Sequence, residues 1–318
     1  MHKILESIKP VIEDANHVKL NHQYVRFFCK HNFLMPGTNW LDSSPINLKQ
    51  LPVKEQLTFA IILNSVSFCF WNLPKWKIEY RGLIYDGSWA MIAAFSKAKS
   101  NGFKIFSFDF LSNLSESQFN EILGDENELT FKMERLEIIK EVSKLMMNKF
   151  QGNPLLLIDY CGLDALEIID FLITEITSFR DYSDYNDHRV FFNKRAQLLA
   201  SDINNILISY DGKGLINSDK ITACADYKIP YILREFNVLE YSEELAKLIE
   251  DRVLIDKHSQ YEIEIRAFSI WAIEELKKEY LTLGISYSSS EINDFLWLIS
   301  QIKSPNYRPY HLTKTISY

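Results

Sequence analysis

The sequence predicts a mostly α-helical protein with little β-structure, and three observations support that prediction. Apolar residues recur at helical spacing along most of the 318-residue chain. Residues that cap helices stand before several of these stretches. Segments with the alternation and composition of strands are few. The chain has no repeat of fixed period and no low-complexity linker, so we expect one compact domain over residues 1–318, in which 1–54 form an N-terminal helical part.

In chain order, helical patterns with one apolar stripe cover about 54–72, 88–101, 129–149 and 163–179. Between the first two, residues 76–85 alternate roughly and end near Gly87, which indicates a short hairpin or extended segment. The apolar run at 154–160 fits either a strand or the start of a buried helix, and periodicity does not decide between them.

Three further helices are expected in the C-terminal half. Leu199, Ile203 and Ile206 mark the first. A capping box predicts the start of the second at Ser259, with Glu262 three residues later. The third follows Ser290, and its apolar positions keep the i, i+3, i+4, i+7 rule: Ile292, Phe295, Leu296 and Ile299.

Composition narrows the class of protein. With 47% hydrophobic and 14% aromatic residues the chain can bury a large core. Its net charge of −7 opposes binding to a nucleic-acid duplex. No apolar run approaches the roughly 20 residues that span a bilayer, and the N-terminus lacks a secretory pattern. We therefore expect a soluble, cytoplasmic protein that binds neither duplex nor membrane.

Several common motifs are absent. GLIYDGSW (82–89) has the glycine spacing of a P-loop, but Ser88 replaces its lysine and Trp89 its hydroxyl residue. The four cysteines form no CxxC pair, and the seven histidines show no metal-ligand spacing. No GxSxG motif occurs. The sequence therefore predicts reduced thiols and no metal site.

Lys194 is the first candidate for chemistry. The stretch VFFNKRAQLLASDI (190–203) places it after two phenylalanines at the start of a helix. A lysine near the positive end of a helix, beside aromatic rings, has a lowered pKa, which suits proton transfer or contact with a phosphate. The alternative is a solvated lysine in the first turn.

Asp226 is the second candidate, in TACADYKIP (222–230). Its carboxylate can cap the turn that precedes the proline. It can also face a sugar, where a carboxylate stabilises an oxocarbenium-like centre or activates water. Local chemistry leaves both interpretations open.

Taken together, eight segments resemble the queuosine salvage protein family, the queuosine 5'-phosphate N-glycosylases/hydrolases. They occur in the family's order from about residue 55 to the C-terminus: LNSVSFCFW (63–71), WKIEYRG (76–82), GSWAMIAAFSKAKSNG (87–102), FFNKRAQLLASD (191–202), TACADYKIP (222–230), LEYSEEL (239–245), YEIEIRAFSIW (261–271) and PYHLTKTI (309–316). Each segment alone is weak, but eight in register are a strong signal.

The resemblance implies a helical domain similar to the helical DNA glycosylases. It implies hydrolysis of the N-glycosidic bond of a small nucleotide, queuosine 5'-monophosphate, releasing queuine for salvage into tRNA modification, with no metal or redox cofactor. The family's catalytic lysine and aspartate fall on Lys194 and Asp226. A carboxylate beneath C1' stabilises the charge that builds there as the base leaves. Lys194 can keep Asp226 ionised, contact the substrate or protonate the base, and the sequence leaves these roles open.

The rest of the binding site is expected among aromatic and polar residues. Candidates for walls around a flat base, with core packing as the alternative for each, are Phe68, Trp71, Trp89, Phe191 and Tyr227. Candidates for the 5'-phosphate are Ser88, Lys228, His311 and Lys314. An acidic side chain such as Asp226 or Glu264 suits the N1–H and 2-amino donors of the base.

Departures from the family pattern keep other functions open. Cys224 stands where members often have phenylalanine, Lys228 replaces a frequent arginine, and Leu312 and Lys314 replace arginines near the C-terminus. The alternatives are a non-catalytic protein that binds queuine or a nucleotide, and a glycosylase for another modified nucleotide. A DNA glycosylase is disfavoured by the acidic charge. The sequence sets neither the oligomeric state nor the preference for monophosphate over nucleoside.

Overall fold

The computed structural model describes residues 3–34, 39–41, 44, 48–72, 74–124, 129–302 and 307–318. Those residues form fourteen α-helices, three short 3₁₀ helices and three two-stranded sheets. The prediction of a mostly helical fold with little β-structure is confirmed.

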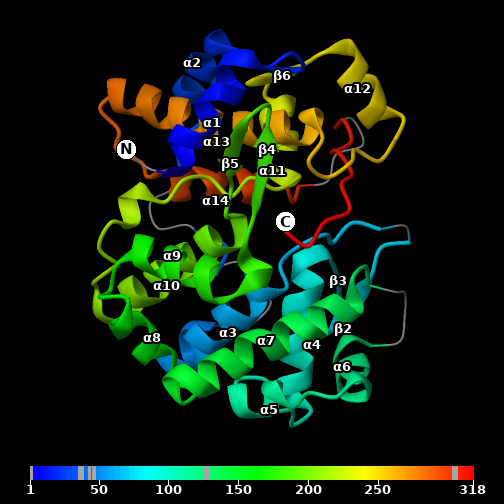
Figure 1. Cartoon of the computed structure of the whole chain (residues 1–318), viewed down its shortest axis with the longest axis vertical. Coiled ribbons are helices and arrows are strands. Elements are labelled where there is room, and N and C mark those ends of the chain that lie inside the picture. Colours follow the sequence, from blue (N-terminus) through cyan, green and yellow to red (C-terminus); the bar gives the residue numbers. More distant parts are fainter. Residues whose placement is uncertain are drawn as a thin grey trace.

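One group of helices packs around a first apolar cluster, in the lower half of Figure 1. It comprises α3 (Val53–Ser65), α4 (Gly87–Ser100), α5 (Phe108–Ser112), α6 (Glu116–Leu123), α7 (Lys132–Phe150), α8 (Pro154–Tyr160), α9 (Ala165–Glu175) and α10 (Lys194–Asp211). The 3₁₀ helices are η1 (Leu48–Gln50), η2 (Thr177–Phe179) and η3 (Ser218–Lys220).

A second group surrounds another apolar cluster, in the upper half of Figure 1. It comprises α1 (Lys3–Asp14), α2 (His22–His31), α11 (Lys228–Glu235), α12 (Glu243–Glu250), α13 (Gln260–Thr282) and α14 (Ser289–Ile299). The C-terminal end of the chain runs between the two groups (Figure 1).

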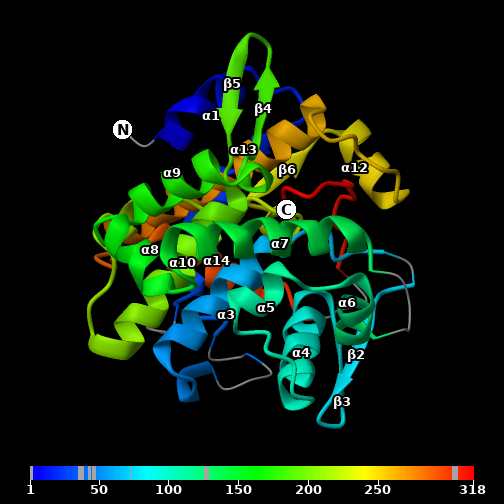
Figure 2. The same ribbon diagram turned by 60° about the horizontal axis from the view of Figure 1, so that its bottom comes forward.

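Each sheet is one antiparallel pair of strands. Strand β1 (Val18–Leu20) pairs with β6 (Leu239–Tyr241), β2 (Lys77–Tyr80) with β3 (Leu83–Asp86), and β4 (Tyr182–Tyr185) with β5 (His188–Phe191). The β2–β3 pair confirms the hairpin expected at 76–85. Figure 2 shows the β4–β5 hairpin at the top of the view, where β5 packs against α1 and β4 against α13, just before the chain enters α10. The sequence did not indicate this hairpin or the β1–β6 pair.

Most expected helices are present, with corrections at their ends. The apolar run at 154–160 is helix α8, whose first turn has Asn153 as its N-cap and Pro154 at a position that needs no N–H donor. The N-cap of α14 is Ser288, not Ser290, and it forms a capping box with Glu291. Ser259 caps α13 as expected by accepting the N–H of Glu262.

The helix expected over 54–72 ends at Ser65. Beyond it the carbonyl oxygens of Val66, Phe68 and Cys69 accept hydrogen bonds from the Arg135 side chain, and Cys69 has a left-handed φ of 42°. In this segment the side chain of Arg135 donates the hydrogen bonds that helical N–H groups would otherwise donate. Apolar periodicity alone therefore overestimates the length of the helix.

No helix in the described ranges is long and apolar enough to cross a membrane. A single domain over the whole chain stays a prediction.

Candidate active site

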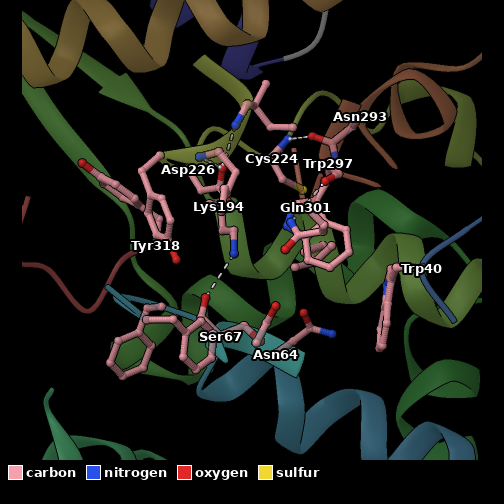
Figure 3. A pocket seen from close by; sticks show the side chains of 18 of the residues that line it. Trp40, Asn64, Ser67, Lys194, Cys224, Asp226, Asn293, Trp297, Gln301 and Tyr318 are labelled. Atoms are coloured by element: carbon pink, nitrogen blue, oxygen red, sulfur yellow. Dashed lines mark hydrogen bonds between the residues drawn. The ribbon is translucent and has the colours of Figure 1, made fainter. Parts of the chain in front are cut away.

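A cavity lies where the two apolar clusters meet, between the end of α3, the starts of α4, α10 and α11, helix α14 and the C-terminal segment (Figure 3). Half of the twelve residues predicted from the sequence line it: Phe68, Ser88, Lys194, Asp226, Tyr227 and Lys228. The chain therefore brings the two catalytic candidates to one cavity.

Asp226 both caps a helix and faces the cavity. Its Oδ1 accepts the N–H groups of Lys228, at 2.7 Å, and Ile229, at 3.1 Å, in the first turn of α11. The side chain is buried and lines the cavity. Because both donors bind Oδ1, capping fixes the orientation of the carboxylate and does not use Oδ2. The two interpretations that local sequence left open are therefore compatible.

Lys194 is buried, with 5% of its surface exposed, so the solvated alternative is wrong. It begins α10 after Asn193, whose φ is 49°. Its Nζ donates to the carbonyl of Ser67 at 3.1 Å. Burial lowers the pKa of Lys194, while the negative charge of Asp226 opposes that shift. The pKa is lowered as the sequence suggested, mainly by burial rather than by the helix dipole.

A buried ion pair connects the backbones that carry these two residues. Arg266 of α13 donates to both carboxylate oxygens of Asp181, at 2.9 and 2.7 Å. Asp181 accepts the backbone N–H of Lys194 at 3.0 Å, while Arg266 Nε donates to the carbonyl of Ala225 at 3.1 Å. Asp181 and Arg266 therefore fix the start of α10 relative to the loop of Asp226.

Three buried cations hold the chain after α3. Arg195 donates to the carbonyl of Ser65, Arg135 to those of residues 66, 68 and 69, and Lys194 to that of Ser67. We call the acceptors, the five carbonyls of residues 65–69, the carbonyl run. The guanidinium of Arg135 also lies 4.1 Å from the ring centre of Phe68. This contact and the hydrogen bonds to the carbonyl run fix the position of Phe68, which lines the cavity.

The aromatic walls differ partly from those expected. Phe68 and Tyr227 line the cavity, and Trp89 lies behind it against two lining residues, with ring centres 6.4 Å from Trp40 and 5.2 Å from Trp297. Trp71 packs in the first apolar cluster, and Phe191 packs against the second. Lining aromatic residues that sequence reasoning missed are Trp40, Phe70, Trp297, Tyr310 and Tyr318.

Of the polar residues predicted to bind the phosphate, two line the cavity and two lie outside it. Ser88 and Lys228 line the cavity, and Lys228 Nζ donates to the carbonyl of Ser300 at 3.3 Å. His311 is buried outside the cavity, where burial and the charge of Arg266 lower its pKa to about 3, so it carries no charge at neutral pH. Lys314 is exposed.

Glu264 also lies outside the cavity. Its carboxylate accepts the N–H groups of Asn16, His17 and Val18 at 3.1, 2.7 and 3.1 Å. It therefore ties the N-terminal part of the chain to α13. Among residues that line the cavity, the acidic side chains that sequence reasoning missed are Asp86 and Asp294.

Helix α14 carries the largest group of missed residues, with Asn293, Asp294 and Trp297 in the cavity. Asn293 Oδ1 accepts the N–H of Cys224 at 3.0 Å, a dashed line in Figure 3. The sequence holds one sign of these residues: two polar residues, Asn293 and Asp294, follow Ile292 in a helix with an apolar face. The structure shows that both are buried, which is uncommon for polar side chains.

Within the described residues, no group of three or more His, Cys, Asp or Glu side chains lies close enough together to hold a metal ion.

The fold and the site define a class: a mostly helical protein with a cavity of the kind that binds small molecules. A buried lysine and a fixed carboxylate line that cavity, together with aromatic rings. Comparison with known families identifies it further. The model of the queuosine salvage protein family matches residues 47–318, and the chain belongs to that family.

Relatives match the chain over nearly its whole length. A protein of Sphaerobacter thermophilus named queuosine 5'-phosphate N-glycosylase/hydrolase is 31% identical, covering 99% of this chain and 97% of the relative. Proteins with the same name from Mus musculus and Dictyostelium discoideum are 28% and 29% identical. The mouse match covers 98% of each chain, and the Dictyostelium match 96% of this chain and 95% of the relative.

Proposed function

We propose that this protein is an N-glycosyl hydrolase that cleaves queuosine 5'-monophosphate and releases queuine, which then serves tRNA modification. The relatives' names supply the substrate. The observation that supports the chemistry is a single cavity lined by the buried carboxylate of Asp226, by Lys194 and by aromatic rings. The substrate is a small molecule rather than a duplex, in keeping with a net charge of −7.

Asp226 is the residue that faces the sugar in this proposal. As the bond between C1' and the base breaks, positive charge builds on C1', and a carboxylate held in place stabilises that charge without reorganising. The capping hydrogen bonds from Lys228 and Ile229 hold it in place. Asp226 also orients the attacking water and takes its proton.

Lys194 supplies a positive charge near Asp226 in this proposal. The negative charge of Asp226 in turn favours the charged form of Lys194, against the cost of burial. Its hydrogen bond to the carbonyl of Ser67 fixes the ammonium group on the cavity wall.

The start of α4 is the proposed site for the 5'-phosphate. Gly87 and Ser88 line the cavity at the N-terminus of this 14-residue helix, where N–H groups and the helix dipole favour an anion. Lys228 lines the same cavity and supplies positive charge, and Lys75 lines it in an ion pair with Asp86 at 3.5 Å. The predicted contributions of His311 and Lys314 are not part of this proposal, because neither lines the cavity.

The base is held between aromatic rings. Phe68, Tyr227 and Trp297 line the cavity, and each ring that stacks on a base is worth about 1–3 kcal/mol.

A binding protein without catalysis is the second candidate. The observation that favours it is Cys224, which lines the cavity where family members often carry an aromatic ring. Leu312, the other departure, is buried and lies outside the cavity, so it changes no wall.

The test is release of queuine from queuosine 5'-monophosphate, followed by chromatography with mass detection. We expect release by the wild-type protein, and a fall of at least about 100-fold with Asp226→Asn, which keeps the cap but loses the charge. Asp170→Asn, at an exposed position in the middle of α9, is the matched control and should keep full activity. Stoichiometric binding of the nucleotide with no base released by the wild type would instead establish the binding protein.

A further inference from the structure

A second pair of carboxyl groups lies at the cavity, away from Asp226 in sequence. Asp294 of α14 lines the cavity, and Asp202 of α10 is buried directly behind two other lining residues. Trp40 donates its indole N–H to Asp202 Oδ1 at 2.7 Å, and Asn64 donates to Oδ2 at 2.6 Å. The mechanism above uses neither carboxyl group.

The two carboxyl groups differ in their hydrogen bonds. Both oxygens of Asp202 accept N–H donors, and hydrogen bonds of this kind favour the ionised form. Asp294 receives one such stabilising contact, from the neighbouring Asn293. Hydrogen bonding therefore favours the ionised form of Asp202 more than that of Asp294.

The surrounding charges agree with this assignment. Burial raises the pKa of Asp294 to about 8, and the charges of Asp202 and Glu291 add to the shift. Burial also raises the pKa of Asp202, to about 7, although its two hydrogen bonds and the charge of Lys194 oppose the shift. The other titratable residues around Asp294, in the cavity and in an adjoining hollow that Asp294 also lines, are Lys49, Lys75, Asp86, Asp219, Cys224, Asp226, Tyr227, Lys228, Tyr310 and Tyr318.

We propose that Asp294 is the general acid that protonates the departing base, and that Asp202 is a positioning residue that keeps the proton on Asp294. This inference rests on the proposed function. It places Asp226, which faces the sugar, and a second carboxyl group, which gives its proton to the base, in one cavity, the arrangement by which glycosidases divide the two halves of the reaction.

The chemistry of the base explains the need for an acid. A purine can leave after protonation at N7, but a 7-deazaguanine has carbon at that position, so the proton must go to another acceptor, O6 or N3. The bond between C1' and N9 breaks, its electron pair moves onto the base, and the Asp294 proton makes the base neutral. Water adds its oxygen to C1' and gives its proton to Asp226. Exchange with solvent then restores both carboxyl groups.

Helix α14 is fixed against the loop that carries Asp226. The hydrogen bond from Cys224 to Asn293 joins the residue before Asp294 to a residue two positions before Asp226. Figure 3 shows Asn293 and Trp297 of α14 beside Cys224, in the same view as Lys194 and Asp226. Lys194 donates one of its three N–H groups to the carbonyl of Ser67, and the proposal uses its positive charge rather than its proton.

The first test varies the leaving group. Asp294→Asn keeps the shape of a neutral carboxyl group but has no acidic proton. With queuosine 5'-monophosphate we expect kcat to fall about 100-fold or more, as for loss of a general acid. With p-nitrophenyl β-ribofuranoside 5'-phosphate, whose phenolate leaves without a proton, we expect less than about a tenth of that loss. Asp226→Asn should reduce cleavage of both substrates, and equal losses with Asp294→Asn would overturn the acid role.

The second test is the pH dependence of kcat for queuosine 5'-monophosphate. Wild-type activity should fall as pH rises through about 8, because Asp294 then loses its proton. Asp202→Asn removes the neighbouring negative charge, so the fall should move to lower pH, whereas a purely structural role of Asp202 would lower activity at every pH alike. An alkaline fall that stays at the wild-type pH in this variant contradicts the proposal. Failure of the wild type to release queuine refutes the hydrolase itself and is thereby distinguished from failure of the acid role.

Discussion

At the scale of single residues, Asp226 combines a structural and a proposed chemical task. Oδ1 accepts two backbone N–H groups of α11, and the same side chain lines the cavity. The geometry that a cap requires is therefore the geometry that would hold the carboxylate beneath a sugar.

Two substitutions of Asp226 should separate its contribution to stability from its contribution to catalysis. Asp226→Ala should lower the free energy of unfolding by about 0.5–2 kcal/mol, the usual cost of losing a cap, while Asp226→Asn should cost only a few tenths. Urea denaturation of both variants measures the difference. Equal stability of the two variants would show that the cap contributes nothing.

Some residues of the candidate site could be predicted from the sequence and others could not. Lys194, Asp226 and Tyr227 lie in short segments that resemble the family, and that resemblance made them candidates for the site. Asp294 and Trp40 belong to no such segment. Trp40 meets Asp202 across 162 positions of sequence, and a contact of that range follows from tertiary packing, which local patterns do not encode.

At the scale of elements, the buried pair of Asp181 and Arg266 connects the residue before β4 with α10 and α13. It fixes the start of α10 through the N–H of Lys194 and the Asp226 loop through the carbonyl of Ala225. Several helices and the β2–β3 hairpin were predicted from the sequence because their patterns depend on near neighbours, whereas the β1–β6 and β4–β5 pairs were not. The end of α3 was not readable, because Arg135 of α7 determines it.

Removal of one partner of this ion pair should be costly. Arg266→Met leaves Asp181 buried without its counter-charge, and we expect a loss of about 3–5 kcal/mol in the free energy of unfolding, together with lower kcat. Arg189→Met is the control, because its ion pair with Asp184 is more than half exposed and should contribute less than about 1 kcal/mol. Chemical denaturation of both variants makes the comparison, and similar losses would contradict a structural role specific to the buried pair.

At the scale of the whole molecule, the cavity lies between two apolar clusters and is built from segments far apart in the chain. Carboxyl groups buried there couple folding to protonation. The pKa of Asp294 is raised in the folded state, so its contribution to stability is fully present below the unfolded pKa of about 3.9 and is lost as pH rises through about 8.

The ligand-free protein should therefore become less stable between about pH 4 and 8 through this group. The measurement is the melting temperature of the wild type and of Asp294→Asn at pH 5 and pH 8.5. The variant has no carboxyl group to ionise at this position, so its melting temperature should fall less over the interval. An identical fall in both proteins would mean that Asp294 does not titrate in this range.

The carbonyl run has a consequence for evolution of the chain. Its five acceptors belong to the backbone, so exchange of a side chain at residues 65–69 cannot delete any of them, whereas Arg135, Lys194 and Arg195 each lose their contacts in a single substitution. Substitutions at the three cations are therefore more constrained than substitutions at the residues whose carbonyls they bind. The segment that shapes the wall of the cavity can change its side chains, and with them the ligands it admits, while the three cations keep its path unchanged.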